Sequence, residues 1–169
     1  MDRDADFRLL LVCMGNICRS PMAEGVLRAR LAERDLGLRV FVDSAGTHGY
    51  HTGAPPDPRA RAAAARRGYE IGELRARQVL AEDFERFDLL LAMDRDNLAE
   101  LQALAPTPEL RQRARLFLEF ASERGDDVPD PYYGGSTGFE RVLDLVEDAV
   151  DGLLNRLPEL AGRAPVAGD

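Results

Sequence analysis

The sequence predicts an α/β fold, in which a four-stranded parallel sheet is flanked by helices and a phosphate-binding loop follows the first strand. Short apolar runs alternate with longer segments that repeat apolar residues at helical spacing, and this alternation is typical of parallel sheets. The chain has 169 residues, 45% of them hydrophobic, which suits one domain with its own core. We expect a single domain over residues 1–169, with a core from about 8 to 155 and a flexible tail over 158–169.

Four short apolar segments are the predicted strands. They cover residues 9–12, 39–42, 88–93 and about 115–118. Ligands of open parallel sheets bind beyond the carboxyl ends of the strands. Cys13 follows the first predicted strand and Ser44 follows the second, so we expect these two residues at the same rim of the sheet.

Four longer segments are the predicted helices. They cover residues 21–34, 58–67, 95–105 and 139–154. The second is rich in Ala and Arg and is closed by Gly68, as expected at a helix C-terminus. Pro106 stops the third. In the fourth, apolar residues recur at helical spacing, namely Val142, Leu143, Val146, Val150 and Leu153.

The segment 13–21, Cys-Met-Gly-Asn-Ile-Cys-Arg-Ser-Pro, directly follows the first predicted strand. Five residues between Cys13 and Arg19 let successive backbone N–H groups point inward and form an anion-binding nest at the foot of a helix. The same amides stabilise a thiolate, so we expect Cys13 to be a nucleophile near neutral pH. Arg19 adds a planar fork that can grip two phosphoryl oxygens.

Other residues of this segment have predicted supporting roles. Gly15 would allow a positive φ, and Ser20 would either cap the helix or donate a hydrogen bond to the Cys13 sulfur. Pro21 suits the first helical position. The phosphate would be enclosed by the rest of the loop, Met14, Asn16, Ile17 and Cys18.

Phosphate ester hydrolysis also needs an acid that protonates the leaving group, and the acidic segment 125–135 supplies candidates. From chemistry alone, Asp126, Asp127 and Asp130 compete for this role. Asp130 is the better positioned, because prolines on both sides stiffen its backbone. An ordinary acidic surface turn is the alternative interpretation of this segment.

Cys18 has two interpretations. It could form a reversible disulfide with Cys13 and protect the nucleophile from overoxidation, or it could only pack beneath the loop. A rival of another class is a zinc-binding module, because Cys13, Cys18, His48 and His51 form two pairs that could make a tetrahedral site. That hypothesis leaves the placement of Arg19 unexplained, so we expect no metal.

Composition excludes several functions. The net charge of −8 argues against nucleic acid and anionic membranes as partners. All 22 basic residues are arginine, which rules out a P-loop nucleotidase and Schiff-base chemistry because both need lysine. Neither a membrane span nor a signal peptide is evident, and two cysteines in one loop fit a reducing compartment. We therefore expect a cytoplasmic protein.

Four motifs in order resemble low-molecular-weight protein tyrosine phosphatases over roughly residues 8–155. They are residues 13–21, Asp-Ser-Ala-Gly-Thr at 43–47, Met-Asp-Arg at 93–95 with Asn97, and Asp-Pro-Tyr-Tyr at 130–133. The resemblance implies a four-stranded parallel α/β fold and hydrolysis of phosphotyrosine proteins or small aryl phosphates through a cysteinyl-phosphate, without a cofactor. It selects Cys13 as nucleophile, Arg19 as clamp and Asp130 as general acid.

Further residues are expected to surround the site. Tyr132 and Tyr133 could form a wall for the substrate ring, with Tyr50 on the opposite side. Hydrogen bonds among Asn16, Ser20 and Ser44 would lock the loop. Leu74 stands where many relatives have a histidine, so this network should differ in detail. Asp94 is expected only to cap a helix.

Close alternatives within the fold remain. Arsenate reductases of the family use further cysteines downstream, and this chain has none after Cys18. Arginine phosphatases carry threonine where this chain has Ile17, so Ile17 favours phosphotyrosine. We expect a monomer, although the sequence does not fix the oligomeric state.

Overall fold

A single parallel sheet forms the centre of the computed structural model, which describes residues 4–132 and 136–162. Its strands are β1 (Phe7–Cys13), β2 (Val40–Gly46), β3 (Leu89–Ala92) and β4 (Ala114–Leu116), in the order β2-β1-β3-β4. All three strand pairs are parallel. The predicted fold class is confirmed, with each strand close to its expected place.

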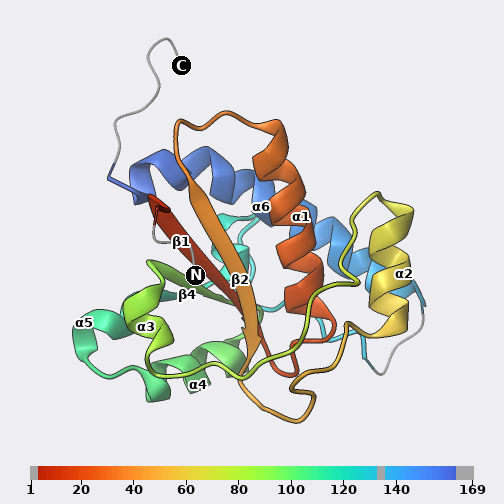
Figure 1. Ribbon diagram of the computed structural model, residues 1–169, viewed down its shortest axis with the longest axis horizontal. Helices are drawn as coiled ribbons and strands as arrows, with labels where there is room; N and C mark the ends of the chain where they lie inside the picture. The colour runs from red at the N-terminus through yellow and green to blue at the C-terminus, as the bar shows by residue number, and fades with distance from the viewer. Residues whose placement is uncertain (1–3, 133–135, 163–169) are drawn as a thin grey trace.

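Helices cover the sheet on both faces. They are α1 (Arg19–Glu33), α2 (Pro58–Arg66), α3 (Asp83–Arg86), α4 (Arg95–Leu104), α5 (Pro108–Arg111) and α6 (Ser136–Leu160), with a 3₁₀ helix η1 (Phe117–Phe120). Figure 1 shows α1, α2 and α6 grouped on one side, and α3, α4 and α5 on the other. The sequence analysis missed α3, α5 and η1, because four residues are too few to show a helical repeat.

Three predicted boundaries need correction. The first helix begins at Arg19 rather than Pro21, so Pro21 is not its first residue. The second strand continues to Gly46, which places Ser44 inside β2 opposite Leu11 of β1. The last helix continues through Pro158 to Leu160, because its buried face extends beyond the predicted repeat to Leu157.

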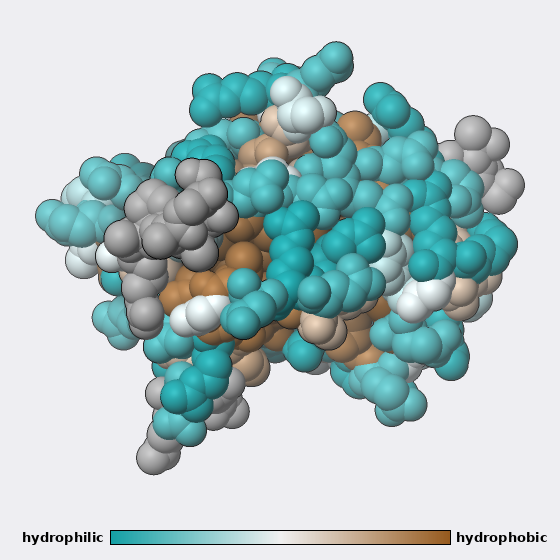
Figure 2. All heavy atoms as spheres, turned by 90° about the horizontal axis from the view of Figure 1, so that it is seen from above, coloured by the Kyte–Doolittle hydropathy of each residue, from teal (hydrophilic) through white to brown (hydrophobic). Residues whose placement is uncertain are grey.

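Successive side chains of β1 point to opposite faces of the sheet, and the core is accordingly divided into two parts. Leu9 and Leu11 belong to the larger cluster, which includes side chains of α1, α2 and α6, whereas Leu10 and Val12 belong to the smaller one on the opposite face. Seen from above, the surface is mostly hydrophilic, with apolar side chains showing at its centre (Figure 2). In the described part of the chain, no helix is long and apolar enough to cross a membrane.

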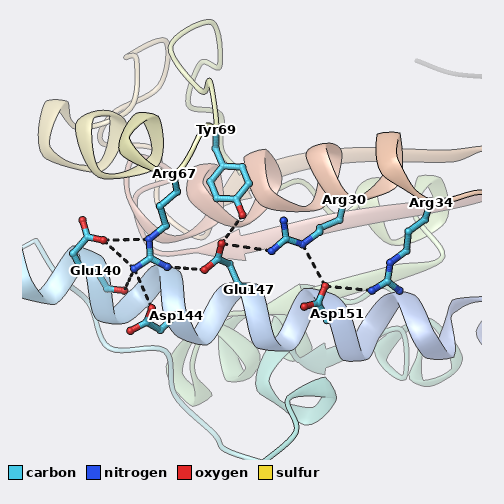
Figure 3. Close-up of polar contacts among 8 residues, drawn as sticks. All are labelled: Arg30, Arg34, Arg67, Tyr69, Glu140, Asp144, Glu147 and Asp151. Atoms are coloured by element: carbon cyan, nitrogen blue, oxygen red, sulfur yellow. Dashed lines mark hydrogen bonds and ion pairs between the residues drawn. The ribbon is translucent and has the colours of Figure 1, made fainter.

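Ion pairs join α6 to the elements beside it (Figure 3). Arg67, directly after α2, binds carboxylates of Glu140, Asp144 and Glu147 on α6 at 2.6–2.9 Å. The Tyr69 hydroxyl donates to Glu147 Oε2 at 2.5 Å. Nearer the other end of the helix, Arg30 and Arg34 bind Asp151. This network fixes α1, which carries part of the site described below, and the end of α2 against the long last helix.

The strand order opens a crevice at one end of the sheet. The chain continues from β1 to β2 on one side, while β3 lies on the other side of β1. Loops after β1 and β3 therefore diverge, and such a switch point is where parallel sheets bind ligands. Cys13 ends β1, and Asp94 follows shortly after β3, so the topology brings these two residues to the same crevice.

Candidate active site

The loop 13–19 connects the end of β1 to the start of α1 and encloses the Cys13 sulfur. Asn16 N donates to Cys13 Sγ at 3.3 Å, and Ser20 Oγ lies 3.0 Å from the same atom. The N-cap of α1 is Cys18, which makes no side-chain capping hydrogen bond. Of the two roles predicted for Ser20, the structure shows the contact with the sulfur.

Asn16, and not Gly15, has the left-handed backbone conformation of this loop. Its φ is 58°, whereas Gly15 is not among the glycines with positive φ. Asparagine is among the side chains that tolerate this region best. Gly15 is constrained by space instead, since a Cβ there would lie 3.0 Å from His51 Cδ2. The expectation of a positive φ at Gly15 was therefore wrong by one residue.

The side chain of Asn16 locks the loop from below. Its Nδ2 donates to Ser20 Oγ at 2.8 Å and to Ser44 Oγ at 3.0 Å, and its Oδ1 accepts from Arg77 N at 3.1 Å. The three side chains Asn16, Ser20 and Ser44 thus form the predicted network. They lie beneath the loop, and none of them lines the cleft above it.

The network continues to Glu24 of α1, which the sequence analysis missed. Ser44 Oγ donates to Glu24 Oε1 at 2.7 Å, and Arg28 Nε donates to Glu24 Oε2 at 2.7 Å. Glu24 is only 1% exposed, and burial raises the pKa of its carboxyl against the opposing effects of Ser44 and Arg28. Leu74 packs against the core, and the Glu24 carboxylate is bound by Arg28 of α1. The sequence feature that could have revealed this role is the position of Glu24 on the predicted helix, four residues from both Ser20 and Arg28.

Arg19 is buried and held by three groups. Its Nη1 donates to Asp94 Oδ2 at 2.6 Å and to the Val128 carbonyl at 3.0 Å, and its Nη2 lies 3.6 Å from Asp130 Oδ2. Burial alone lowers the pKa of Arg19, but the nearby Cys13 and the hydrogen-bonded Asp94 raise it above its ordinary value. The guanidinium is therefore a fixed cation beside the sulfur.

Asp94 has a second role besides the predicted cap. Its Oδ1 accepts from Asn97 N at 2.7 Å, as an N-cap does. The other oxygen, Oδ2, holds Arg19. Sequence reasoning missed this contact because Arg19 and Asp94 are 75 residues apart, although the place of Asp94 directly after an apolar strand was a usable signal.

Only one of the three competing aspartates lines the cleft that contains Cys13, and it is Asp130. Asp127 instead accepts from Arg95 N at 2.8 Å and forms an ion pair with Arg95 at 3.2 Å. The hydrogen bond from the Arg95 backbone, reinforced by its side chain, lowers the pKa of Asp127. Asp130 accepts from Tyr132 N at 3.0 Å, which fixes the turn that carries it.

The cleft has a volume of about 360 Å³ and brings most of the predicted residues together. It is lined by Cys13, Met14, Gly15, Ile17, Cys18, Arg19, Tyr50, His51, Asp130 and Tyr132. Tyr50 is 81% exposed and Tyr132 is 38% exposed, so both rings present faces to solvent at the mouth. The predicted second wall residue, Tyr133, lies outside the described residues.

Two neighbours of the aromatic walls were not predicted. The Arg59 guanidinium lies 5.5 Å from the centre of the Tyr132 ring and donates to the Tyr132 carbonyl at 2.9 Å. The His48 ring stacks on Tyr50 with 5.2 Å between ring centres. The walls of the mouth are therefore supported by the start of α2 and by the loop after β2.

Both cysteines are free and buried. Burial, with smaller contributions from Asp57 and Cys13, raises the pKa of the Cys18 thiol, which favours the neutral thiol at this position beside Cys13. His48 lies 3.5 Å from Glu100. Across the described ranges, no three His, Cys, Asp or Glu side chains are grouped as metal ligands, so the zinc hypothesis has no supporting cluster there.

A sulfur and a fixed guanidinium from the loop 13–19 meet the carboxyl group of Asp130, which comes from the segment before α6, in this cleft. They correspond to the three needs of phosphate ester cleavage, which are attack, neutralisation of charge and protonation of the leaving group. The fold and the site together define the class of cysteine-dependent phosphatases.

Comparison with known proteins narrows this class. Residues 8–161 match the family model described as low molecular weight phosphotyrosine protein phosphatase. A low molecular weight protein-tyrosine-phosphatase of Streptomyces coelicolor is 48% identical over 162 residues, which cover 94% of this chain and 98% of the relative. The human low molecular weight phosphotyrosine protein phosphatase is 37% identical over 143 residues, which cover 84% and 90%.

Solved structures of protein tyrosine phosphatases are also similar to this chain. A crystal structure of a protein tyrosine phosphatase from Entamoeba histolytica matches with a TM-score of 0.86 and 42% identity, covering 90% of this chain and 97% of that one. The chain belongs to the low molecular weight phosphotyrosine protein phosphatase family. It is accordingly a protein-tyrosine phosphatase, a hydrolase of phosphoric monoesters.

Proposed function

We propose that Cys13 attacks the phosphorus of phosphotyrosine while Asp130 protonates the departing phenolic oxygen. An S–P bond forms, the P–O bond to the tyrosine breaks, and the proton passes from the Asp130 carboxyl to the tyrosine. The observation that carries this proposal is the meeting of Cys13, Arg19 and Asp130 in one cleft. Arg19, held by Asp94, and the loop N–H groups bear the negative charge that develops on the phosphoryl oxygens.

The second step returns the enzyme to its starting state. Asp130, now a carboxylate, takes a proton from a water molecule that attacks the cysteinyl-phosphate. The P–O bond to water forms, the S–P bond breaks, and Cys13 leaves as a thiolate that Ser20 and the Asn16 amide support at 3.0 and 3.3 Å. Inorganic phosphate is the product.

The substrate is a phosphotyrosine protein or a small aryl phosphate. The walls Tyr50 and Tyr132 offer aromatic faces to a phenyl ring, and Ile17 and Met14 add apolar surface at the cleft. The apolar Ile17 favours phosphotyrosine over phosphoarginine, because a guanidinium needs polar partners. A monomer in the reducing cytoplasm, with both cysteines free, is the setting that we propose.

The test is hydrolysis of a chromogenic aryl phosphate in excess chelator, for the wild type and Cys13→Ser side by side. Activity that is lost in Cys13→Ser, with binding of inorganic phosphate retained, would support the assigned nucleophile. Equal activity in both proteins would refute it. A second comparison uses phosphotyrosine and phosphoarginine peptides, and faster turnover of the arginine substrate would overturn the substrate preference.

A further inference from the structure

The segment that carries Asp130 is anchored on both sides of this residue. Before it, the Val128 carbonyl accepts from Arg19 Nη1 at 3.0 Å. After it, the Tyr132 carbonyl accepts from Arg59 Nη2 at 2.9 Å. Asp130 therefore lies between one anchor on the loop 13–19 and a second anchor at the start of α2.

The second anchor acts on the residue that orients the Asp130 carboxyl. Tyr132 N donates to Asp130 Oδ1 at 3.0 Å, while the carbonyl of the same tyrosine is bound by Arg59. The Arg59 guanidinium also lies 5.5 Å from the centre of the Tyr132 ring, within the range of a cation–π contact. One side chain of α2 thus holds both the backbone and the ring of Tyr132.

Arg59 is itself held in place. Its Nε donates to Asp57 Oδ1 at 3.1 Å and its Nη2 to Asp57 Oδ2 at 3.0 Å. Nη2 has two protons, which serve Asp57 and the Tyr132 carbonyl. The guanidinium lies 5.0 Å from the centre of the Phe139 ring as well. A planar guanidinium in such a fork loses little freedom when it binds a further group, so Arg59 is a preorganised donor.

Asp57 connects this donor to the loop that carries the nucleophile. Asp57 N donates to the Ile17 carbonyl at 2.8 Å, and its side chain caps α2 by accepting from Arg59 N at 2.8 Å. Ile17 belongs to the loop that begins at Cys13 and lines the catalytic cleft. The contacts Ile17, Asp57, Arg59 and Tyr132 therefore join the loop 13–19 to the segment that carries the acid.

Arg59 has no direct part in substrate binding in this arrangement. It is not among the described residues that line the catalytic cleft, and its charge faces Asp57 at 3.0 Å. The helix that carries it lies beside the start of α6 (Figure 1), to which Arg66 of α2 is joined by an ion pair with Glu140 at 2.9 Å. Arg59 is thus a donor on a supported helix that reaches the catalytic cleft only through Tyr132.

We propose that Arg59 is a positioning residue, which holds the segment 130–132 against the loop 13–19 and so keeps the Asp130 carboxyl in the catalytic cleft. The inference rests on the proposed function, in which Asp130 protonates the leaving group. A displacement of about 1 Å can slow an enzymatic step roughly 10²-fold. Loss of Arg59 removes the anchor on one side of Asp130 while the anchor at Val128 stays, so we expect a partial loss of about tenfold.

The test measures kcat/KM for a series of aryl phosphates with poor to good leaving groups, because this constant reports the step in which the phenol departs. Arg59→Met removes the donors and should lose about tenfold with poor leaving groups and about twofold or less with good ones. The inhibition constant of inorganic phosphate should equal that of the wild type, because the loop amides and Arg19 are unaltered. The matched control is Arg61→Met, which removes an exposed arginine of α2 that does not line the catalytic cleft.

Two further variants separate positioning from charge and from folding. Arg59→Lys keeps the charge but cannot bind Asp57 and Tyr132 with one planar fork, so most of the loss should remain. Asp57→Asn keeps the cap of α2, since asparagine caps about as well as aspartate, and weakens the fork, so it should show the same leaving-group dependence. Rates equal to the wild type in Arg59→Lys, or equal losses across the series in Arg59→Met and Asp57→Asn, would overturn the positioning role.

A double variant shows whether Arg59 acts through Asp130. With poor leaving groups, Asp130→Ala/Arg59→Met should be no slower than Asp130→Ala, because no acid is left to position. A further tenfold loss in the double variant would overturn the inference. If Asp130→Ala depended on the leaving group and Arg59→Met did not, only the role of Arg59 would be refuted. If Asp130→Ala itself slowed all esters equally, the acid role in the proposed function and this inference would both be refuted.

Discussion

Replacement of Asp94 by asparagine separates the two roles of this carboxylate. Asparagine caps helices about as well as aspartate, so the start of α4 keeps its hydrogen bond. The substitution removes the negative charge that holds Arg19 at 2.6 Å. Hydrogen bonds to charged groups contribute about 1.5–3 kcal/mol, and Arg19 keeps its contacts with Val128 and Asp130. At about 1.4 kcal/mol per factor of ten, kcat/KM should fall about tenfold to a hundredfold.

The assay is kcat/KM for a chromogenic aryl phosphate, together with the inhibition constant of inorganic phosphate and the thermal unfolding midpoint. Asp94→Asn should weaken phosphate inhibition and also lower the midpoint, because the same hydrogen bond to the buried Arg19 stabilises the fold. Asp94→Ala, which also lacks the cap, should lose about 1 kcal/mol of stability in addition. The matched control is Asp127→Asn, because Asp127 lies near the same helix start and binds Arg95 instead. Unchanged kinetics in Asp94→Asn would refute the reasoning that this carboxylate positions Arg19.

Three further predictions concern the acid, the buried carboxylate beneath the loop and the ion-pair network. Asp130→Ala should slow aryl esters with poor leaving groups by about 10²–10⁴-fold and those with good ones much less; equal losses across a leaving-group series would disprove the acid role. Glu24→Gln should lower kcat and slow the alkylation of Cys13 by iodoacetate. If both rates equalled those of the wild type, Glu24 would have no role in supporting the site. Arg66 and Arg67 lower the pKa of Glu140 from its ordinary value of 4.5, so its contribution to stability is present above that pH and is lost as the pH falls through the lowered pKa. Unfolding midpoints measured from neutral to acid pH should therefore fall less in Glu140→Gln than in the wild type.

Local features of the site could be predicted from the sequence. The apolar run that ends at Cys13, the spacing to Arg19 and the helix that follows are all contained in one short segment, so the pattern determines the loop directly. Asp130 was preferred to its neighbours for its flanking prolines, which are also a local feature, and it is the one of the three aspartates that lines the cleft. Its chemical role stays a prediction.

Long-range contacts were beyond the reach of the pattern. Arg19 meets Asp94 across 75 residues, and Arg59 meets Tyr132 across 73. Such pairs depend on how α2 and α4 pack, which periodicity does not specify. The error at Gly15 has another origin, because glycine is the usual residue at positive φ and asparagine was not considered for it. The left-handed position became clear only from the backbone.

The direction of the hydrogen bonds beneath the loop explains why a buried carboxylate is kept so close to an anion site. Asn16 Nδ2 has two protons, and both are used, one for Ser20 and one for Ser44. Ser44 can accept this bond because its own proton is committed to Glu24 at 2.7 Å. Ser20 also accepts from Asn16, so its single proton is left for the Cys13 sulfur at 3.0 Å.

Glu24 therefore supports the loop beneath Cys13 through the direction of its hydrogen bond with Ser44. Because a carboxylate can only accept, Ser44 must donate to it, while the backbone N–H of Arg77 donates to Asn16 Oδ1 and so orients Nδ2 as the donor to Ser44 and Ser20. Arg28 compensates the charge by donating to the other oxygen of Glu24. A glutamine at this position could turn its amide group toward Ser44, which would leave the Ser44 proton without its acceptor and weaken the support of Asn16 beneath the loop. The arrangement thus leaves the Ser20 hydroxyl proton for the Cys13 sulfur.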